Sequence, residues 1–222
     1  ECTGGQCGPK SVWMSKPRDT ALVFLTKGEK SPNKREIAQM MLEKDATILF
    51  MQSKELMTPL MIACQRKNED MVNLFVREGW YGQEGGGGGD GGVRTKDNYL
   101  IQQDQKGNTA FSYACVSGLR KTTASKLIDT NCKVMVQSDH EGTIPLMKAS
   151  ANGHVDLVEL LVESWQRHIC FDYRMAEVLN EEHPNGGDTS LMMASREGHV
   201  GVVNLLLGAG ADVTLTNKVT NE

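Results

Sequence analysis

The chain is built from one segment that recurs, and this recurrence constrains the fold more than any other feature. The segment TSLMMASREGHVGVVNLLLGAGADV (residues 189–213) contains a threonine, a small and apolar stretch, Gly-His, a second apolar stretch and Gly-Ala-Asp-Val. Related segments begin at Thr20, Thr58, Thr109 and Ile144, so that successive starts are 38, 51, 35 and 45 residues apart. Self-similarity at such a period predicts a solenoid, in which each unit buries its apolar face against its neighbours.

The recurring segment resembles the ankyrin repeat, whose consensus contains T-P-L-H-x-A and a Gly-His turn before a second helix rich in valine and leucine. The resemblance covers about residues 16–217. The consensus histidine after the leucine is absent, because Met61, Ser112, Met147 and Met192 occupy its positions. The matching elements are Thr58-Pro59-Leu60, Ile144-Pro145-Leu146, Gly153-His154, Gly198-His199 and Gly210-Ala211-Asp212-Val213.

The resemblance implies an all-α solenoid of five helix–turn–helix units joined by β-like finger loops. We expect an N-terminal tail over residues 1–15, one array over 16–217, and the truncated start of a further segment at 218–222. The steps exceed the basic unit of about 33 residues, which places inserts in the loops. These inserts are expected at 28–33, 80–103 and 164–185. More protein is expected beyond residue 222, because the helix VGVVNLLL has no polar outer face.

Two of the inserts differ in character. GGGGGDGG (85–92) predicts a flexible loop, and it is not a P-loop because no Gly-Lys-Ser/Thr follows it. The insert at 164–185 contains Trp165, Phe171 and Tyr173, so it either packs back on the stack or offers a contact surface. Of these two readings we favour packing.

Each unit carries local signals for its helices. Threonine caps the first helix, and proline fits the first turn, where no amide donor is needed. The small residues Ala63, Ala114, Ala149 and Ala194 let the first helices approach their neighbours closely. Gly153 and Gly198 provide a positive φ in the turn. We expect His154 and His199 to form hydrogen bonds across that turn.

Composition excludes several classes of protein. The formal net charge of −4 gives no sign of the basic stripe of a nucleic-acid binder. No apolar run approaches the ~20 residues of a membrane span, and the N-terminus has no signal-peptide core, so no membrane insertion is expected. Cys64 and Cys115 occupy a small-residue position of the repeat and are expected to be buried free thiols. This favours a reducing, intracellular and cytoplasmic location. Cys2 and Cys7 either pair or remain free.

No pattern indicates catalysis, a cofactor or a metal. The sequence contains no C-x-x-C, H-E-x-x-H or EF-hand motif. His168 and Cys170 are two residues apart, which on a helix points them in different directions. The methionines at repeat positions are expected to fill the core, although they also suit a forgiving binding surface. We therefore expect a protein that is not an enzyme.

The ankyrin resemblance implies a non-catalytic, monomeric scaffold that binds a protein partner on its finger tips and on the exposed residues of its first helices. The alternative is a regulatory or targeting arm of a larger enzyme or channel, and a minor alternative is an elastic spacer. The finger positions are Lys54, Glu55, Met57, Gln105, Lys106, Asn108, His140, Glu141, Thr143, Asn185, Gly186 and Asp188; the first-helix positions are Gln65, Arg66, Val116, Ser117, Ala151, Asn152, Arg196 and Glu197.

Overall fold

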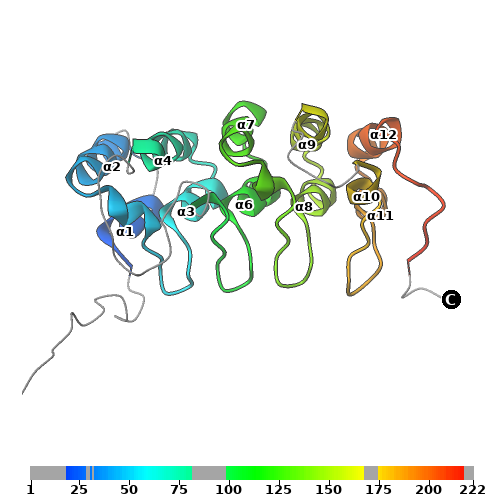
Figure 1. Ribbon diagram of the computed structural model, residues 1–222, viewed down its shortest axis with the longest axis horizontal. Helices are drawn as coiled ribbons and strands as arrows, with labels where there is room; N and C mark the ends of the chain where they lie inside the picture. Colours follow the sequence, from blue (N-terminus) through cyan, green and yellow to red (C-terminus); the bar gives the residue numbers. More distant parts are fainter. Residues whose placement is uncertain (1–18, 29–30, 32, 82–98, 168–174, 218–222) are drawn as a thin grey trace, which may run out of the picture.

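The computed structural model describes residues 19–28, 31, 33–81, 99–167 and 175–217, and these form two layers of helices (Figure 1). One layer holds the first helix of every repeat, and neighbouring first helices pack against one another along the array. The loops that lead into the first helices of the second to fifth repeats project from the same side of the stack. The first helices are α1 (Ala21–Lys27), α3 (Pro59–Gln65), α6 (Ala110–Ser117), α8 (Pro145–Ala151) and α11 (Ser190–Arg196).

The other layer holds the second helices, each of which packs against the first helix of its own repeat. Short elements follow three of the second helices: η2 (Ala46–Phe50), η3 (Cys132–Met135) and α10 (Met175–Leu179). The described residues contain no β-strand, so the expected all-α solenoid is confirmed. The second helices are α2 (Asn33–Lys44), α4 (Glu69–Tyr81), α7 (Lys121–Thr130), α9 (Val155–Arg167) and α12 (Val200–Gly208).

The first helices begin where the sequence predicts, because a threonine hydroxyl satisfies a backbone donor of the first turn. Thr58 Oγ1 accepts the N–H of Met61 at 3.2 Å, and Thr109 Oγ1 accepts that of Ser112 at 3.1 Å. Thr20 and Thr189 cap α1 and α11 in the same way. Ile144 has the same extended backbone as the threonines but no side-chain oxygen, so α8 lacks this cap.

Replacing Thr58 with valine removes one cap while keeping the shape of the side chain. We expect the free energy of unfolding to fall by about 1 kcal/mol, because the N–H of Met61 loses its acceptor in a buried site. Urea denaturation measures the change. The matched control is Thr122→Val on the exposed surface of α7, which caps no helix and is expected to leave the midpoint unchanged. Equal losses in the two variants would contradict the capping role.

The core runs through the whole array as one apolar cluster, from Leu22 in the first repeat to Leu206 in the fifth. The alanines expected to allow close approach of the helices are at most 1% exposed: Ala63, Ala114, Ala149 and Ala194. The repeats therefore share a single continuous core.

The two repeat histidines bridge consecutive repeats. His154 Nε2 donates to the carbonyl of Val116 at 3.0 Å, and His199 Nε2 donates to that of Ala151 at 3.1 Å. The prediction that each ring bonds across its own turn was wrong, because the acceptors are carbonyls at the end of the first helix of the preceding repeat. The ring also occupies the space in which a side chain at the preceding turn glycine would lie. A Cβ on Gly118 would come within 2.5 Å of His154.

The insert positions differ in how much structure they contain. In the range 28–33, Gly28 directly follows α1 and Asn33 begins α2, whereas residues 29, 30 and 32 lie outside the described residues. In the range 80–103, Tyr99 and Leu100 are buried, and the Tyr99 ring lies 5.2 Å from that of Phe50. The end of this range therefore belongs to the core, because it covers the apolar residues of η2. Residues 85–92 lie outside the described residues, as do the tail with Cys2 and Cys7.

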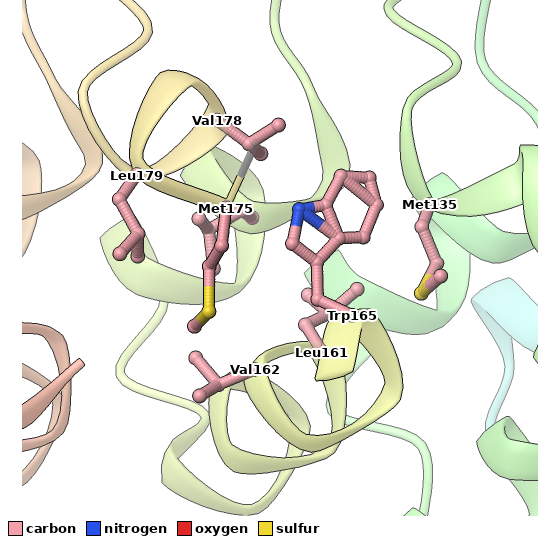
Figure 2. A pocket seen from close by; sticks show the side chains of 8 residues that line it. Met135, Leu161, Val162, Trp165, Met175, Val178 and Leu179 are labelled. Atoms are coloured by element: carbon pink, nitrogen blue, oxygen red, sulfur yellow. The ribbon is translucent and has the colours of Figure 1, made fainter. Parts of the chain in front are cut away.

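The insert at 164–185 contributes the end of α9 and all of α10. Val178 and Leu179 are buried, and Trp165 is partly buried against the core. Figure 2 shows that Trp165, Met175 and Val178 line an apolar cavity beneath α10, with a volume of about 20 Å³. Such a volume holds about one water molecule, so this part of the insert packs on the stack. His168, Cys170, Phe171 and Tyr173 lie outside the described residues.

The described cysteines divide into two kinds. Cys64 and Cys115 are free and fully buried, as expected, and burial raises the pKa of each thiol. Cys132 is disulfide-bonded. This disulfide does not fit the reducing compartment that the free thiols favour, because disulfides persist in oxidising environments.

Candidate partner-binding surface

The fingers are tight turns that close just before each first helix. The backbone N–H of Asp104 donates to the carbonyl of Asn108 at 3.0 Å, and that of Asp139 donates to the carbonyl of Thr143 at 3.2 Å. The fingers before α3 and α11 close in the same way, with bonds from Ser53 to Met57 and from His183 to Asp188. Helices α3, α6, α8 and α11 therefore start directly from the base of a finger.

The first side chain of a finger organises the backbone of the turn. Asp104 Oδ1 accepts the N–H groups of Lys106 and Asn108, both at 2.8 Å. Asp139 Oδ1 accepts those of Glu141 and Thr143, at 3.0 and 2.8 Å. In the finger before α3, Ser53 Oγ accepts the N–H groups of Glu55 and Met57 in the same way. These carboxylates and this hydroxyl fix the loop, and the tip side chain of Gln105 donates from its Nε2 to the carbonyl of Lys54 in the preceding finger at 2.9 Å.

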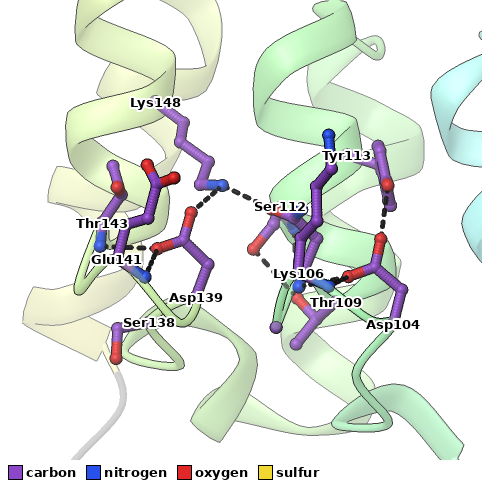
Figure 3. Close-up of polar contacts among 12 residues, drawn as sticks. Asp104, Lys106, Thr109, Ser112, Tyr113, Ser138, Asp139, Glu141, Thr143 and Lys148 are labelled. Carbon is purple, nitrogen blue, oxygen red and sulfur yellow. Dashed lines mark hydrogen bonds and ion pairs between the residues drawn. The ribbon is translucent and has the colours of Figure 1, made fainter.

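The second carboxylate oxygen ties the finger to the helix that follows it (Figure 3). Asp104 Oδ2 accepts the hydroxyl of Tyr113 at 2.5 Å, and Asp139 Oδ2 lies 2.6 Å from Lys148 Nζ. Lys148 also donates to the side chain of Asn108 in the neighbouring finger. Tyr113 and Lys148 both lie nine residues after the aspartate that they contact. The ammonium of Lys148 therefore holds two consecutive fingers and their helix together.

These contacts shift the pKa of Tyr113 and of Asp139 in opposite directions. Burial, followed by the hydrogen bond to the Asp104 carboxylate, raises the pKa of Tyr113, so the phenol stays protonated. At Asp139, burial acts to raise the pKa, but the Lys148 ammonium and the backbone donors of Thr143 and Glu141 outweigh it. The pKa of Asp139 consequently lies below its usual value, and the ion pair persists at neutral pH.

Backbone hydrogen bonds also join the tips of the first three fingers. The N–H of Gln105 donates to the carbonyl of Glu55 at 3.3 Å, and the N–H of His140 donates to the carbonyl of Lys106 at 3.0 Å. We call this series of bonds the tip ladder. Gln103 adds a side-chain bridge, because its Nε2 donates to the carbonyls of Gly107 and Ser138, at 2.8 Å each.

The tip ladder stops at the fourth finger. Pro184 follows His183 just as Gln105 follows Asp104 and His140 follows Asp139, and proline has no N–H to donate. Side chains replace the missing bond. Thr143 Oγ1 and His183 Nε2 share a hydrogen bond at 3.2 Å, and the Pro184 ring lies where a Cβ on Gly142 would be.

Comparison with known families agrees with this architecture. A family model described as "Ankyrin repeats (3 copies)" matches residues 29–137, 96–170 and 120–217. The chain belongs to the ankyrin-repeat family. No curated protein matches the chain. Members of this family are generally non-catalytic modules for protein–protein interaction.

The ankyrin array places most of the predicted contact residues on its surface. Thirteen are exposed, and five others, Asn108, Ser117, Thr143, Ala151 and Asp188, are partly exposed, as is Gly186. The partly exposed residues bond within the array. Ser117 Oγ donates to the carbonyl of Cys64 at 2.9 Å, for example. The exposed residues are Lys54, Glu55, Gln65, Arg66, Gln105, Lys106, Val116, His140, Glu141, Asn152, Asn185, Arg196 and Glu197.

Met57 does not belong to this surface. Its side chain is 5% exposed and packs in the core, directly before the helix cap Thr58. The last residue of the finger faces inward because the chain enters α3 at this point. A partner therefore has no access to Met57 without opening the second repeat.

The residues that bind Asp104 and Asp139 were not predicted from the sequence. Tyr113 and Lys148 were left out of the predicted surface, although both occupy the fourth position after the start of their repeats. A shared spacing could have identified them. Each lies nine residues after a finger aspartate, Asp104 or Asp139, and each carries a hydrogen-bond donor. By contrast, the residue that pairs with Asp188 was predicted. It is Arg196, whose guanidinium lies 2.6 Å from the Asp188 carboxylate.

Within the described ranges, no group of three or more histidine, cysteine, aspartate or glutamate side chains is placed to hold a metal ion. The helices found there are also too short or too polar to cross a membrane.

Proposed function

We propose that this ankyrin array is a non-catalytic scaffold that holds a protein partner on its finger loops and on the exposed ends of its first helices. The same surface would serve if the array were the targeting arm of a larger enzyme or channel. The residues proposed for contact are the thirteen exposed ones named above, with Asn108, Ser117, Thr143, Ala151, Gly186 and Asp188 supporting them from partly exposed positions.

The observation that carries this proposal is an exposed row of side chains on a fixed backbone. Most backbone donors of the first three fingers bond to the first residue of their own finger, and the tip ladder joins these fingers side by side. Tip side chains such as Lys54, Lys106 and Glu141 remain exposed. A surface that is already ordered loses little backbone entropy when a partner binds, which favours affinity.

The chemistry of the row favours a partner of mixed polarity. Lys54 and Glu55 lie side by side on the first finger, and His140 and Glu141 do so on the third. On the first-helix side, Val116 is 44% exposed in the middle repeat. A central apolar contact with a polar rim is the usual anatomy of a protein interface.

Affinity capture from a cell lysate, followed by mass spectrometry, tests the proposal. The bait is the wild-type chain or a variant in which Gln65, Arg66, His140, Glu141, Arg196 and Glu197 are replaced by alanine. We expect a partner that the wild type retains and the variant loses. The variant removes as many acidic as basic side chains, so its net charge equals that of the wild type.

A matched control locates the site. Arg35, Glu36, Gln166 and Asn204 are exposed on the second helices, and their replacement by alanine also leaves the net charge unchanged. This control is expected to retain the partner, and both variants must melt like the wild type. A partner lost from the control but kept by the finger variant would place the site on the second-helix layer and would contradict the proposal.

A further inference from the structure

The fourth finger is one residue longer than the other three. It closes between His183 and Asp188, a span of six residues, whereas the other fingers close over five. Gly187 has a φ of 69°, at the position that a residue of positive φ also occupies in each of the other fingers. Gly186 is therefore the additional residue. A Cβ at this glycine would meet no atom of the described residues within 4 Å, apart from its own chain neighbours.

The additional glycine directly follows an asparagine. In an Asn-Gly pair the backbone nitrogen of the glycine can attack the side-chain amide of the asparagine, because glycine has no Cβ to hinder the approach. The sequence contains two such pairs, Asn152-Gly153 and Asn185-Gly186. Their backbone bonding does not distinguish them, since each glycine N–H donates to a backbone carbonyl at 3.2 Å.

The surroundings of the first pair hold it in place. Asn152 Nδ2 donates to the carbonyl of Lys148 at 2.7 Å. Gly153 has a φ of 70°, and a Cβ at this glycine would lie within 2.6 Å of the His199 ring. An attack on the Asn152 amide therefore has to break a hydrogen bond and move the backbone against a packed ring.

The second pair has neither restraint. Asn185 is exposed, and within the described residues its side chain forms no hydrogen bond. Its backbone N–H donates to His183 Nδ1 at 3.3 Å, and this contact leaves the side chain free to turn toward the next residue. The Gly186 nitrogen lies in the open space described above. The amide of Asn185 and this nitrogen can therefore approach each other without unpacking the array.

We propose that Asn185 is a site of spontaneous deamidation through a cyclic imide. The Gly186 nitrogen loses its proton to water and forms a bond to Asn185 Cγ. The bond between Cγ and Nδ2 breaks, and the side-chain nitrogen leaves as ammonia. One water molecule then opens the imide at either carbonyl. The product is aspartate, or isoaspartate, in which the main chain runs through the former side-chain carbonyl.

The reaction changes the charge of the fourth finger. It places a carboxylate at the tip, three residues before Asp188, and Asn185 is one of the proposed contact residues. The isoaspartate product also lengthens the backbone of the finger by one carbon. An effect on partner binding rests on the proposed function, whereas the reaction itself does not, so the experiment below follows the reaction without a partner.

Peptide mass spectrometry of the whole chain, incubated at neutral pH in water enriched in heavy oxygen, tests the proposal. The heavy oxygen marks acid that forms during the incubation and not during the later digestion. We expect acid to accumulate at Asn185 about tenfold faster than at Asn152, a difference of about 1.4 kcal/mol in activation free energy. We also expect both aspartate and isoaspartate, because direct hydrolysis of the amide would give aspartate alone.

Two controls assign the difference to the structure. Gly186→Ala places a methyl group where no neighbour lies, so the turn is expected to keep its shape while the Cβ slows the attack about tenfold. In urea, where the fold no longer restrains Asn152, the two asparagines of the wild type are expected to react at similar rates.

Equal rates at Asn152 and Asn185 in the folded chain would overturn the proposal. So would aspartate as the sole product at Asn185, or an unchanged rate in Gly186→Ala. If this variant melts below the wild type, the comparison of folded with urea-unfolded wild type replaces it. A rate difference that persists in urea would then count against the proposal, because it would arise from the local sequence and not from the fold.

Discussion

Ala149→Asp is expected to lower the free energy of unfolding by about 4 kcal/mol, because it places a carboxylate without a partner in the core. Ala149 is fully buried in α8, and this helix packs against α6, α9 and α11. The new side chain must either remain charged in an apolar site, take up a proton, or force three helices apart. All three outcomes cost stability in the repeats on both sides.

Calorimetry measures the effect. For a chain of this size, about 2–4 °C of melting temperature is lost per kcal/mol, so the expected drop is about 10 °C. The matched control is Ala176→Asp on the exposed surface of α10, which is expected to stay within about 0.5 kcal/mol of the wild type. An unchanged melting temperature for Ala149→Asp would show that the repeat register assigned here is wrong.

Lys148→Met is expected to cost about 3 kcal/mol at pH 7, because it leaves the carboxylate of Asp139 without its cation. The two side chains are 11% and 9% exposed, and their charged atoms lie 2.6 Å apart. Methionine keeps most of the volume of the lysine stem, so the loss reports the charge rather than a cavity. The second variant, Lys148→Met/Asp139→Asn, removes both charges and retains an acceptor for the turn. We expect it to regain most of the loss.

The pH dependence of Lys148→Met separates the ion pair from packing. The pKa of Asp139 in the folded chain lies below the usual 3.8, so the pair stabilises the fold above that pH. This contribution is lost as the pH falls through the lower folded pKa. The difference between wild type and Lys148→Met is therefore largest near neutral pH and shrinks below about pH 4. Denaturant titrations across this range measure it. A constant difference would assign the loss to packing.

The features that the sequence predicted are those that depend on neighbouring residues. A threonine hydroxyl caps its own helix three residues on, as Thr58 and Thr109 show. The small residue at the position of Ala149 recurs in each of the last four units, so the close helix contact could be predicted from the repeat alone. The alignment of the repeats also predicted that most finger residues are exposed.

The features that the sequence did not predict depend on partners far along the chain. His154 bonds to Val116, which is 38 residues away, and Gln103 bonds to Ser138, which is 35 residues away. The choice of acceptor depends on how two repeats are offset in space, and no single repeat contains that information. Met57 was misplaced for a related reason, since its burial depends on the angle at which the finger meets α3.

The proline at position 184 makes the fourth finger differ from the first three. The first three fingers are linked to one another by backbone hydrogen bonds, whereas the fourth is joined to the third by a hydrogen bond between side chains. On the proposed contact surface, a partner that touches only the first three fingers would meet a backbone that is already tied together. For a partner that also reaches Asn185, we expect the fourth finger to set a less strict limit on shape, because no backbone hydrogen bond joins it to the third.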